Sequence, residues 1–180
     1  MRTMWSGRVG DAAERTLSFA ALGVLLLAGV AVAEPLPAPK GEVLLRVSGA
    51  IARTNLGDEA AFDRAMLEAM RQRVFVTGTI WTEGRSTFTG VPLKALLDRV
   101  GARGVAVRAL ALNDYAATIP ISDLRDDAPM VVHLRDGETI PIREQGPLWI
   151  LYPFDDEAEW RTEVAYSRSV WQLVRLDVVD

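Results

Sequence analysis

The stretch Gln145-Gly-Pro-Leu-Trp-Ile-Leu-Tyr-Pro-Phe-Asp-Asp-Glu-Ala-Glu-Trp160 sets five large apolar or aromatic residues in a row, encloses them between prolines and then turns acidic. In a strand, alternation sends Leu148, Ile150 and Tyr152 to one face and Trp149 and Leu151 to the other. Both faces are apolar. This is typical of a core strand covered twice, or of a strand covered once that lines a pocket on its other face. We expect Trp149 to be a core residue and Tyr152 to border a cleft, because its hydroxyl needs a partner.

Working outward, the pattern predicts two main helices. Apolar residues at helical spacing predict the first over Asn55–Arg71, with Asn55 or Asp58 as its cap and its two methionines as core residues. The second is expected over Val91–Gly101, because Pro92 suits a first turn and Gly101 suits a helix end.

Strands are expected in larger number than helices. They are predicted at Val43–Ser48, Val74–Ile80, Val105–Leu112, Tyr115–Ile119, Met130–Leu134, Thr139–Ile142, Leu148–Tyr152 and Val170–Val179. Trp81–Gly90 is predicted as a loop and Arg135–Glu138 as a hairpin turn. The sequence therefore predicts an α+β domain with a mostly antiparallel sheet or barrel and two main helices.

The N-terminal region predicts export. Arg2, Arg8 and Arg15 precede an apolar run that closes with Ala31-Val32-Ala33, the pattern of a cleaved secretory signal peptide over residues 1–33. An uncleaved anchor is the alternative, although the run is shorter than the roughly 20 residues that span a bilayer. Alternating prolines predict an extended linker over residues 34–41, outside a folded domain at 42–180.

Charge and cysteine content exclude some functions. Residues 1–33 hold three of the 20 basic and two of the 24 acidic residues, so 17 basic and 22 acidic residues remain, a net charge of −5. An acidic chain without a run of basic residues lacks the electrostatic signature of a nucleic-acid-binding protein. The chain has no cysteine, so an exported domain would be held together by packing alone.

Several segments, in order, resemble one family. They are Phe88-Thr-Gly-Val-Pro-Leu93, Ala111-Leu-Asn-Asp-Tyr115, Asp136-Gly137, Gly146-Pro-Leu-Trp-Ile-Leu-Tyr-Pro153 and Ser167-Arg-Ser-Val-Trp-Gln172. Together they resemble the oxidoreductase molybdopterin-binding domain, the sulfite-oxidase fold, and in particular its small exported members. The resemblance covers roughly residues 43–179.

The resemblance implies a molybdenum pterin held through a cysteine thiolate that follows the strand after the first helix. The matching segment here, Val74–Trp81, carries Thr77 and Thr79, and the chain has no cysteine. A neutral hydroxyl offers neither the charge nor the softness of a thiolate. Pterin phosphates are bound by arginines, histidines or helix N-termini. We expect the only histidine, His133, to be a sheet residue instead.

The predicted route of export also indicates a protein without a bound molybdenum pterin. A protein loaded with a large cofactor in the cytoplasm crosses the membrane folded and carries a twin-arginine signal, whereas Arg2, Arg8 and Arg15 are each isolated. We therefore expect a periplasmic member of the family without molybdenum redox activity, a sensory or accessory module that binds a small ligand or a signalling or redox protein. We expect no bound cofactor, although the resemblance implies molybdopterin. The alternative is a molybdopterin-dependent oxidoreductase with a non-cysteine metal ligand.

The candidate cleft residues lie in several separate segments. They are Thr79, Trp81, Asn113, Tyr115, Arg143, Tyr152 and Arg168. Asp155, Asp156, Glu157 and Glu159 offer carboxylates for a hard cation, but we expect a solvated acidic loop instead. None of Ser48, Ser86 and Ser122 has a histidine placed for nucleophilic catalysis.

The signal-peptide pattern makes a direct prediction. We expect the exported protein to begin at or near Glu34, because the apolar run is short and ends in Ala31-Val32-Ala33. Intact mass and N-terminal sequencing measure this. A periplasmic species that keeps Met1 and partitions with membranes would favour the anchor.

Overall fold

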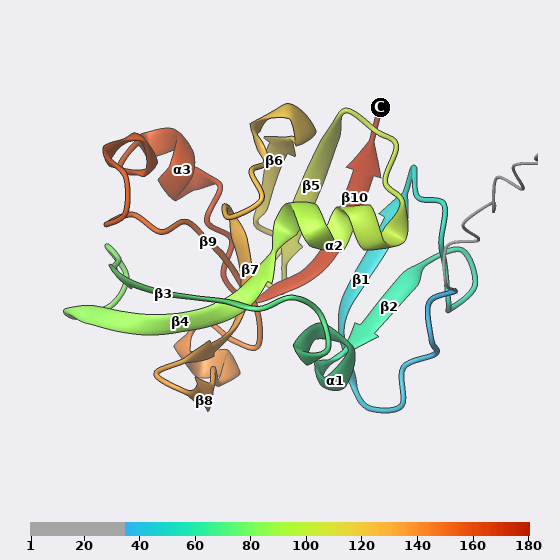
Figure 1. Cartoon of the computed structure of the whole chain (residues 1–180), viewed down its shortest axis with the longest axis horizontal. Helices are drawn as coiled ribbons and strands as arrows, with labels where there is room; N and C mark the ends of the chain where they lie inside the picture. The colour runs from blue at the N-terminus through green and yellow to red at the C-terminus, as the bar shows by residue number, and fades with distance from the viewer. Residues whose placement is uncertain (1–34) are drawn as a thin grey trace, which may run out of the picture. The chain divides into compact units, whose positions relative to one another are not determined.

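The computed structural model describes residues 35–180, so the predicted signal peptide lies outside the described residues. Two open sheets organise this part of the chain (Figure 1). The first sheet has the order β2 (Ala60–Asp63), β1 (Val43–Gly49), β10 (Leu173–Val179), β5 (Ala106–Ala111) and β6 (Ala116–Pro120). The second has the order β3 (Arg73–Gly78), β4 (Arg85–Pro92), β7 (Met130–Arg135) and β8 (Glu138–Thr139), and β9 (Trp149–Leu151) also pairs with β7.

The predicted α+β class is confirmed, and the barrel alternative is wrong because the two sheets do not close. β1 pairs in parallel with β10, and the other pairs between these strands are antiparallel. The helices are α1 (Arg64–Glu68), α2 (Leu93–Val100) and α3 (Glu163–Ser167), with single 3-10 turns at Ile121–Asp123, Ile142–Glu144 and Ala158–Trp160.

The predicted second helix is confirmed as α2. Leu93, Leu96, Leu97 and Val100 form its buried face, and Gly101 ends it with a φ of 65°. The predicted hairpin is also confirmed: β7 pairs with β8 across Asp136 and Gly137, both at positive φ. Asn-Gly and Asp-Gly are the pairs that such tight turns favour.

The predicted first helix is wrong over its N-terminal half. Ala60–Asp63 is a buried strand that pairs with β1, and only Arg64–Glu68 is helical. Asp63 caps α1 by accepting a hydrogen bond from the Met66 amide at 2.9 Å. Asn55 is not a cap, since its side chain bonds to the backbone of Ala61. Pairing with β1 therefore overrides the helical spacing.

The predicted loop over Trp81–Gly90 is wrong from Arg85 onward, where β4 begins. Phe88 of this strand pairs with Phe75 of β3, and both rings are buried. Gly90 lets β4 approach β7 closely, because a Cβ there would lie 2.5 Å from the Val131 carbonyl oxygen. The β3–β4 hairpin reaches away from the first sheet (Figure 1).

The predicted free tether also needs correction in its described part. Leu36 is buried in the core beside the first sheet. The amides of Lys40 and Gly41 donate to the Asp63 carboxylate at 2.7 and 2.9 Å. Residues 35–41 therefore pack on the domain. Within residues 35–180, no helix has the length and apolar character to cross a membrane.

Strand β9 is buried on both faces. Leu148 and Ile150 pack in the first core, which includes α2 and the first sheet, whereas Trp149 and Leu151 pack in the second core, formed mainly by aromatic residues. The alternation predicted for these four residues is confirmed. It fails at Tyr152, which follows the end of the strand and packs in the second core at 3% exposure. The prediction that Tyr152 borders a cleft is wrong.

The acidic segment after Pro153 is exposed over residues 156–159, as predicted for a solvated loop, but its carboxylates are also ion-paired. The Asp155 carboxylate accepts a hydrogen bond from the Gly78 amide at 2.9 Å and pairs with Arg85 and Arg161. Asp156 pairs with Arg73 at 2.8 Å. Further along, Glu157 and Glu159 both pair with Arg125. The segment thus holds the end of the β3–β4 hairpin through ion pairs, and residues 35–180 contain no cluster of ligands suited to a metal ion.

The two-sided burial of β9 predicts a large loss of stability for Trp149→Ala. We expect the free energy of unfolding to fall by about 3 to 5 kcal/mol, the range for deleting a buried large aromatic side chain. Tyr152→Phe removes only an oxygen and should change the free energy of unfolding by less than about 1.5 kcal/mol. Val74→Ala, on an exposed position of β3, is the control. Denaturant unfolding measures all three, and a near-neutral Trp149→Ala would contradict the packing described.

The hydrogen bond from the Gly78 amide, reinforced by Arg85 and Arg161, holds the pKa of Asp155 below its usual value of 3.8. A carboxyl group with a lowered pKa in the folded state stabilises the fold above pH 3.8, and this contribution is lost as the pH falls through the folded-state pKa. Asp155→Asn should therefore destabilise the protein at pH 7, and the difference from the native protein should shrink below pH 3.8.

Chemical denaturation at a series of pH values measures this difference. Asp58→Asn is the matched control, because Asp58 is exposed and forms no side-chain hydrogen bond within residues 35–180. It should leave stability at pH 7 unchanged. A difference for Asp155→Asn that stays constant below pH 3.8 would contradict the stabilising role of the carboxylate.

Candidate functional site

A cavity of about 370 Å³ opens beside the loop that follows β3. Four segments contribute to it: the β3–β4 loop, the turn between β5 and β6, α3, and the residues that lead into β10. Its lining consists of Trp81, Asn113, Tyr115, Tyr166, Ser167, Ser169 and Trp171. We call this cavity the aromatic pocket, because four of its seven lining residues carry aromatic rings.

The sequence predicted three of the lining residues. The aromatic pocket brings together Trp81, Asn113 and Tyr115, although Trp81 and Tyr115 are 34 positions apart in the sequence. Thr79, Arg143, Tyr152 and Arg168 do not line it. The prediction missed Tyr166, Ser167, Ser169 and Trp171. Three of these four lie in the segment Ser167–Gln172, which carried the family resemblance, so that segment offered a usable signal.

Trp81 separates the aromatic pocket from the second core. Its ring centroid lies 5.6 Å from that of Trp149 and 6.0 Å from that of Tyr166, both in edge-to-face geometry. A third contact, at 6.3 Å, joins it to Phe154. Edge-to-face pairs are favourable because the positive edge of one ring meets the negative face of another. Neighbouring rings therefore hold the wall of the pocket in place.

The polar groups of the pocket are fixed by backbone contacts. The Tyr115 hydroxyl donates to the Ser167 carbonyl at 2.7 Å, and the Ser169 hydroxyl donates to the Ala165 carbonyl at 2.9 Å. The side-chain oxygen Oδ1 of Asn113 accepts a hydrogen bond from the Tyr115 amide at 3.2 Å. A hydroxyl whose O–H donates one hydrogen bond can still accept hydrogen bonds through its lone pairs. The pocket therefore presents aromatic faces together with hydrogen-bond acceptors.

The two threonines of the segment that matches the cysteine region are engaged in local structure. Thr79 accepts hydrogen bonds from the amides of Trp81 and Thr82 at 3.1 and 3.0 Å, which fixes the turn that positions Trp81. Thr77 is fully buried, donates to the Gly78 carbonyl and accepts from the Asp155 amide at 3.1 Å. Both hydroxyls are engaged in hydrogen bonds that stabilise the loop.

The cationic candidates are also paired elsewhere. Arg168 forms an ion pair with Asp123 at 2.9 Å, and Arg143, whose side chain is 85% exposed, lies beside Glu144. Tyr152 lies near Arg168, which lowers its pKa, but burial has the larger effect and raises that pKa to about 12. Tyr152 is therefore a neutral core phenol at physiological pH.

His133 is a core residue, as predicted. It is buried in β7, and its Nε2 donates to the Gln72 side-chain oxygen at 2.8 Å. Burial lowers the pKa of the imidazole, which keeps it neutral, with Glu68 opposing and Arg64 reinforcing the effect. His133 does not line the aromatic pocket.

The residues of the aromatic pocket do not fit a molybdenum pterin. A molybdenum ligand of the thiolate type is excluded because the chain has no cysteine. A pterin phosphate needs cationic or amide donors, whereas the lining has no lysine, arginine or histidine. The chemistry of the donor set thus favours an uncharged organic ligand over a metal complex.

Comparisons with known proteins agree with this fold. Residues 61–155 match the model of a family described as the oxidoreductase molybdopterin binding domain. The structure is similar to that of the sulfane dehydrogenase SoxCD from Paracoccus pantotrophus, with 19% sequence identity and a TM-score of 0.57. The match covers 76% of this chain and 38% of that one, so this chain spans well under half of the neighbour. At this identity the likeness shows the fold alone.

A search of curated proteins finds no match. The family match nevertheless covers more than half of the 180 residues and includes β3, β4, α2 and β7. The chain therefore belongs to the oxidoreductase molybdopterin-binding domain family and has its sulfite-oxidase-like α+β fold.

Proposed function

We propose that this protein is a periplasmic ligand-binding module of the family, with a sensory or accessory role and without molybdenum redox activity. One observation carries the proposal: beside the segment that would hold the family's cysteine, the chain builds a pocket of aromatic rings with no thiolate and no cation. A shared fold does not imply a shared reaction. The sulfane dehydrogenase activity named for SoxCD belongs to that protein.

The ligand that suits the pocket is a small, flat, uncharged ring compound with hydrogen-bond donors. Trp81, Tyr115, Tyr166 and Trp171 supply ring surfaces, against which planar compounds stack. The hydroxyls of Tyr115 and Ser169 donate to backbone carbonyls and are left as acceptors, so they would receive the ligand's N–H or O–H groups. A volume of about 370 Å³ lies within the range of small-molecule pockets.

Export to the periplasm rests on the sequence pattern of residues 1–33. Three isolated arginines, a short apolar run and Ala31-Val32-Ala33 support secretion in an unfolded form. A chain secreted in this way folds outside the cytoplasm and does not bring a preloaded metal cofactor with it. This route agrees with a pocket that has no thiolate to hold molybdenum.

The proposal predicts the metal content of the protein. Protein purified from its native periplasm should contain far less than one molybdenum per chain, because no thiolate is present to hold the metal. Elemental analysis of the folded protein measures this, with a thiolate-ligated member of the family as the positive control. About one molybdenum per chain, released together with a pterin on denaturation, would overturn the proposal.

The proposal also predicts where a ring compound binds. With a metal-free pterin as the probe, calorimetric titration should detect binding, and Tyr115→Ala should weaken it by at least about tenfold because a stacking surface is lost. Leu112→Ala is the matched control, since Leu112 is exposed in the same turn but does not line the pocket. Equal weakening by both variants, or binding unchanged by Tyr115→Ala, would contradict binding in the aromatic pocket.

A further inference from the structure

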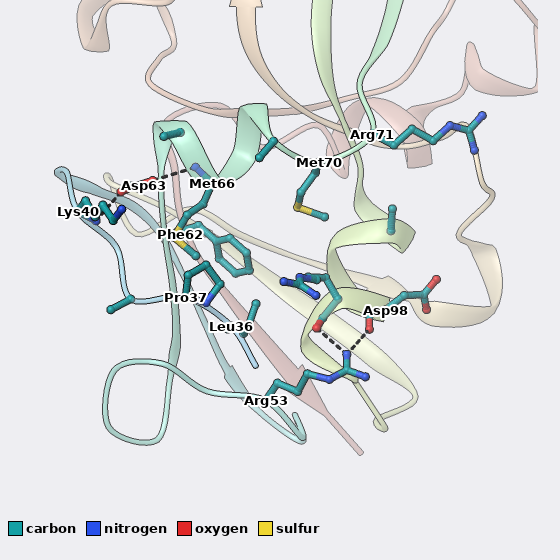
Figure 2. A pocket seen from close by; sticks show the side chains of 15 residues that line it. Leu36, Pro37, Lys40, Arg53, Phe62, Asp63, Met66, Met70, Arg71 and Asp98 are labelled. Carbon is teal, nitrogen blue, oxygen red and sulfur yellow. Dashed lines mark hydrogen bonds between the residues drawn. The ribbon is translucent and has the colours of Figure 1, made fainter. Parts of the chain in front are cut away.

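A second cavity, of about 740 Å³, lies among the N-terminal segment, α1 and α2, and shares no lining residue with the aromatic pocket. Its walls come from residues 36–40, from β2 with α1, and from α2, with Arg53 at one side. Figure 2 shows the side chains of Phe62 and Met70 directed into the hollow. We call this cavity the methionine pocket, after Met66 and Met70.

Three of the residues that line the hollow have small side chains. Ala65 and Ala69 at α1 and Ala95 on α2 carry only a methyl group each. The floor is formed by larger apolar residues: Leu36, Phe62, Met66 and Met70. Both methionines are half-buried: they pack against the first core, as helical spacing predicted, and also line the hollow. Methionine side chains adapt readily to apolar ligands of varied shape.

The charges around the methionine pocket are unbalanced. Its two carboxylates are already engaged: Asp63 accepts from three backbone amides, and Asp98 pairs with Lys94. Four cations, Lys40, Arg53, Arg71 and Arg99, also line it. None of the four forms an ion pair within residues 35–180. Within residues 35–180, the cavity therefore has more cations than carboxylates available to a ligand.

Arg99 is the most informative of these cations. It is half-buried on α2, and its guanidinium makes no hydrogen bond to the described residues. Arg53 is half-buried as well and donates to the carbonyls of Asp98 and Arg99 at the end of α2, as Figure 2 shows. A guanidinium has five N–H donors arranged to bind a carboxylate through two hydrogen bonds. The two arginines thus present spare donors next to an apolar floor.

We propose that the methionine pocket binds a free fatty acid, with the alkyl chain on Phe62, Met66 and Met70 and the carboxylate at Arg99. The apolar floor accounts for the chain and the unpaired cations account for the anionic head. A membrane surface is excluded as the occupant by shape, because a bilayer binds apolar groups that project from a protein and does not enter a hollow. The volume lies within the range of sites for small molecules.

The test uses protein expressed from its full coding sequence with methionine labelled by ¹³C at the methyl group. Sodium dodecanoate, below the concentration at which it forms micelles, is the probe. The methyl signals of Met66 and Met70 should shift to saturation, whereas that of Met130, fully buried in the second core, should not. Single Met→Leu substitutions assign the signals. Dodecyltrimethylammonium, with the same chain and a cationic head, should cause no saturable shift.

Two variants connect the effect to the pocket. Arg99→Gln should weaken dodecanoate binding by at least about tenfold, because a charge-assisted contact is lost. The matched control is Arg143→Gln, on an exposed side chain outside the pocket, which should leave binding unchanged. Ala95→Leu keeps a helix-favouring residue but fills the hollow, and it should also weaken binding in a protein that still unfolds cooperatively.

Three results would overturn the proposal. Equal binding of the cationic amphiphile would show that the unpaired cations do not select the head group. Co-sedimentation with phosphatidylglycerol vesicles, without a response to monomeric dodecanoate, would identify a membrane-binding surface. Shifts of Met66 and Met70 that follow protein concentration alone would identify a second copy of the chain as the occupant.

Discussion

Burial of β9 on both faces is the constraint that joins the two halves of this domain. Leu148 and Ile150 face a core shared with the first sheet and α2, and Trp149 and Leu151 face the aromatic core on the other side of the second sheet. Hydrogen bonds from Ile150 to Val170 and from Leu173 to Leu148 also tie this region to the chain that leads into β10. A strand placed in this way cannot shift by one residue without moving each side chain into the wrong core.

The aromatic pocket depends on this arrangement. Trp149 supports Trp81 by edge-to-face contact, and Trp171 lines the pocket while forming a bridge with Trp149. The pocket wall is therefore an extension of the second core, supported by Trp149, which does not itself line the pocket. The acidic segment adds to this support, because Asp155 bonds to Gly78 and fixes the end of β3 immediately before Trp81. The carboxylates of this segment are therefore engaged by arginines and a backbone amide.

The two cavities differ in chemistry, and each difference has a local cause. The aromatic pocket is lined by uncharged residues, and Arg168 and Arg143 lie outside it beside Asp123 and Glu144. The methionine pocket has the opposite character, since its carboxylates are engaged by backbone amides or by Lys94 and its cations are left unpaired. In this fold, the ion pairs and hydrogen bonds of the charged residues thus determine which charged groups remain available in each cavity.

The sequence by itself determined the features that rest on local patterns. These include α2 with its terminal Gly101, the β7–β8 turn at Asp136 and Gly137, the alternation over residues 148–151, and the family, through segments that keep their order. It also identified Trp81, Asn113 and Tyr115 as cleft residues. Such features depend on neighbours a few positions apart, whose spacing is visible in the sequence.

The tertiary structure alone decided the features that depend on distant partners. Ala60–Asp63 is a strand because β1 pairs with it, and Tyr152 is buried because the chain turns after Leu151 into the second core. The acidic residues are ion-paired because the fold brings Asp155 to Arg85 and Asp156 to Arg73, which are 70 and 83 positions away in the sequence. Neither the methionine pocket nor its unpaired cations could be predicted, since they arise where three separate segments pack. Helical spacing cannot distinguish a methionine in a core from one that lines a cavity, because both face inward.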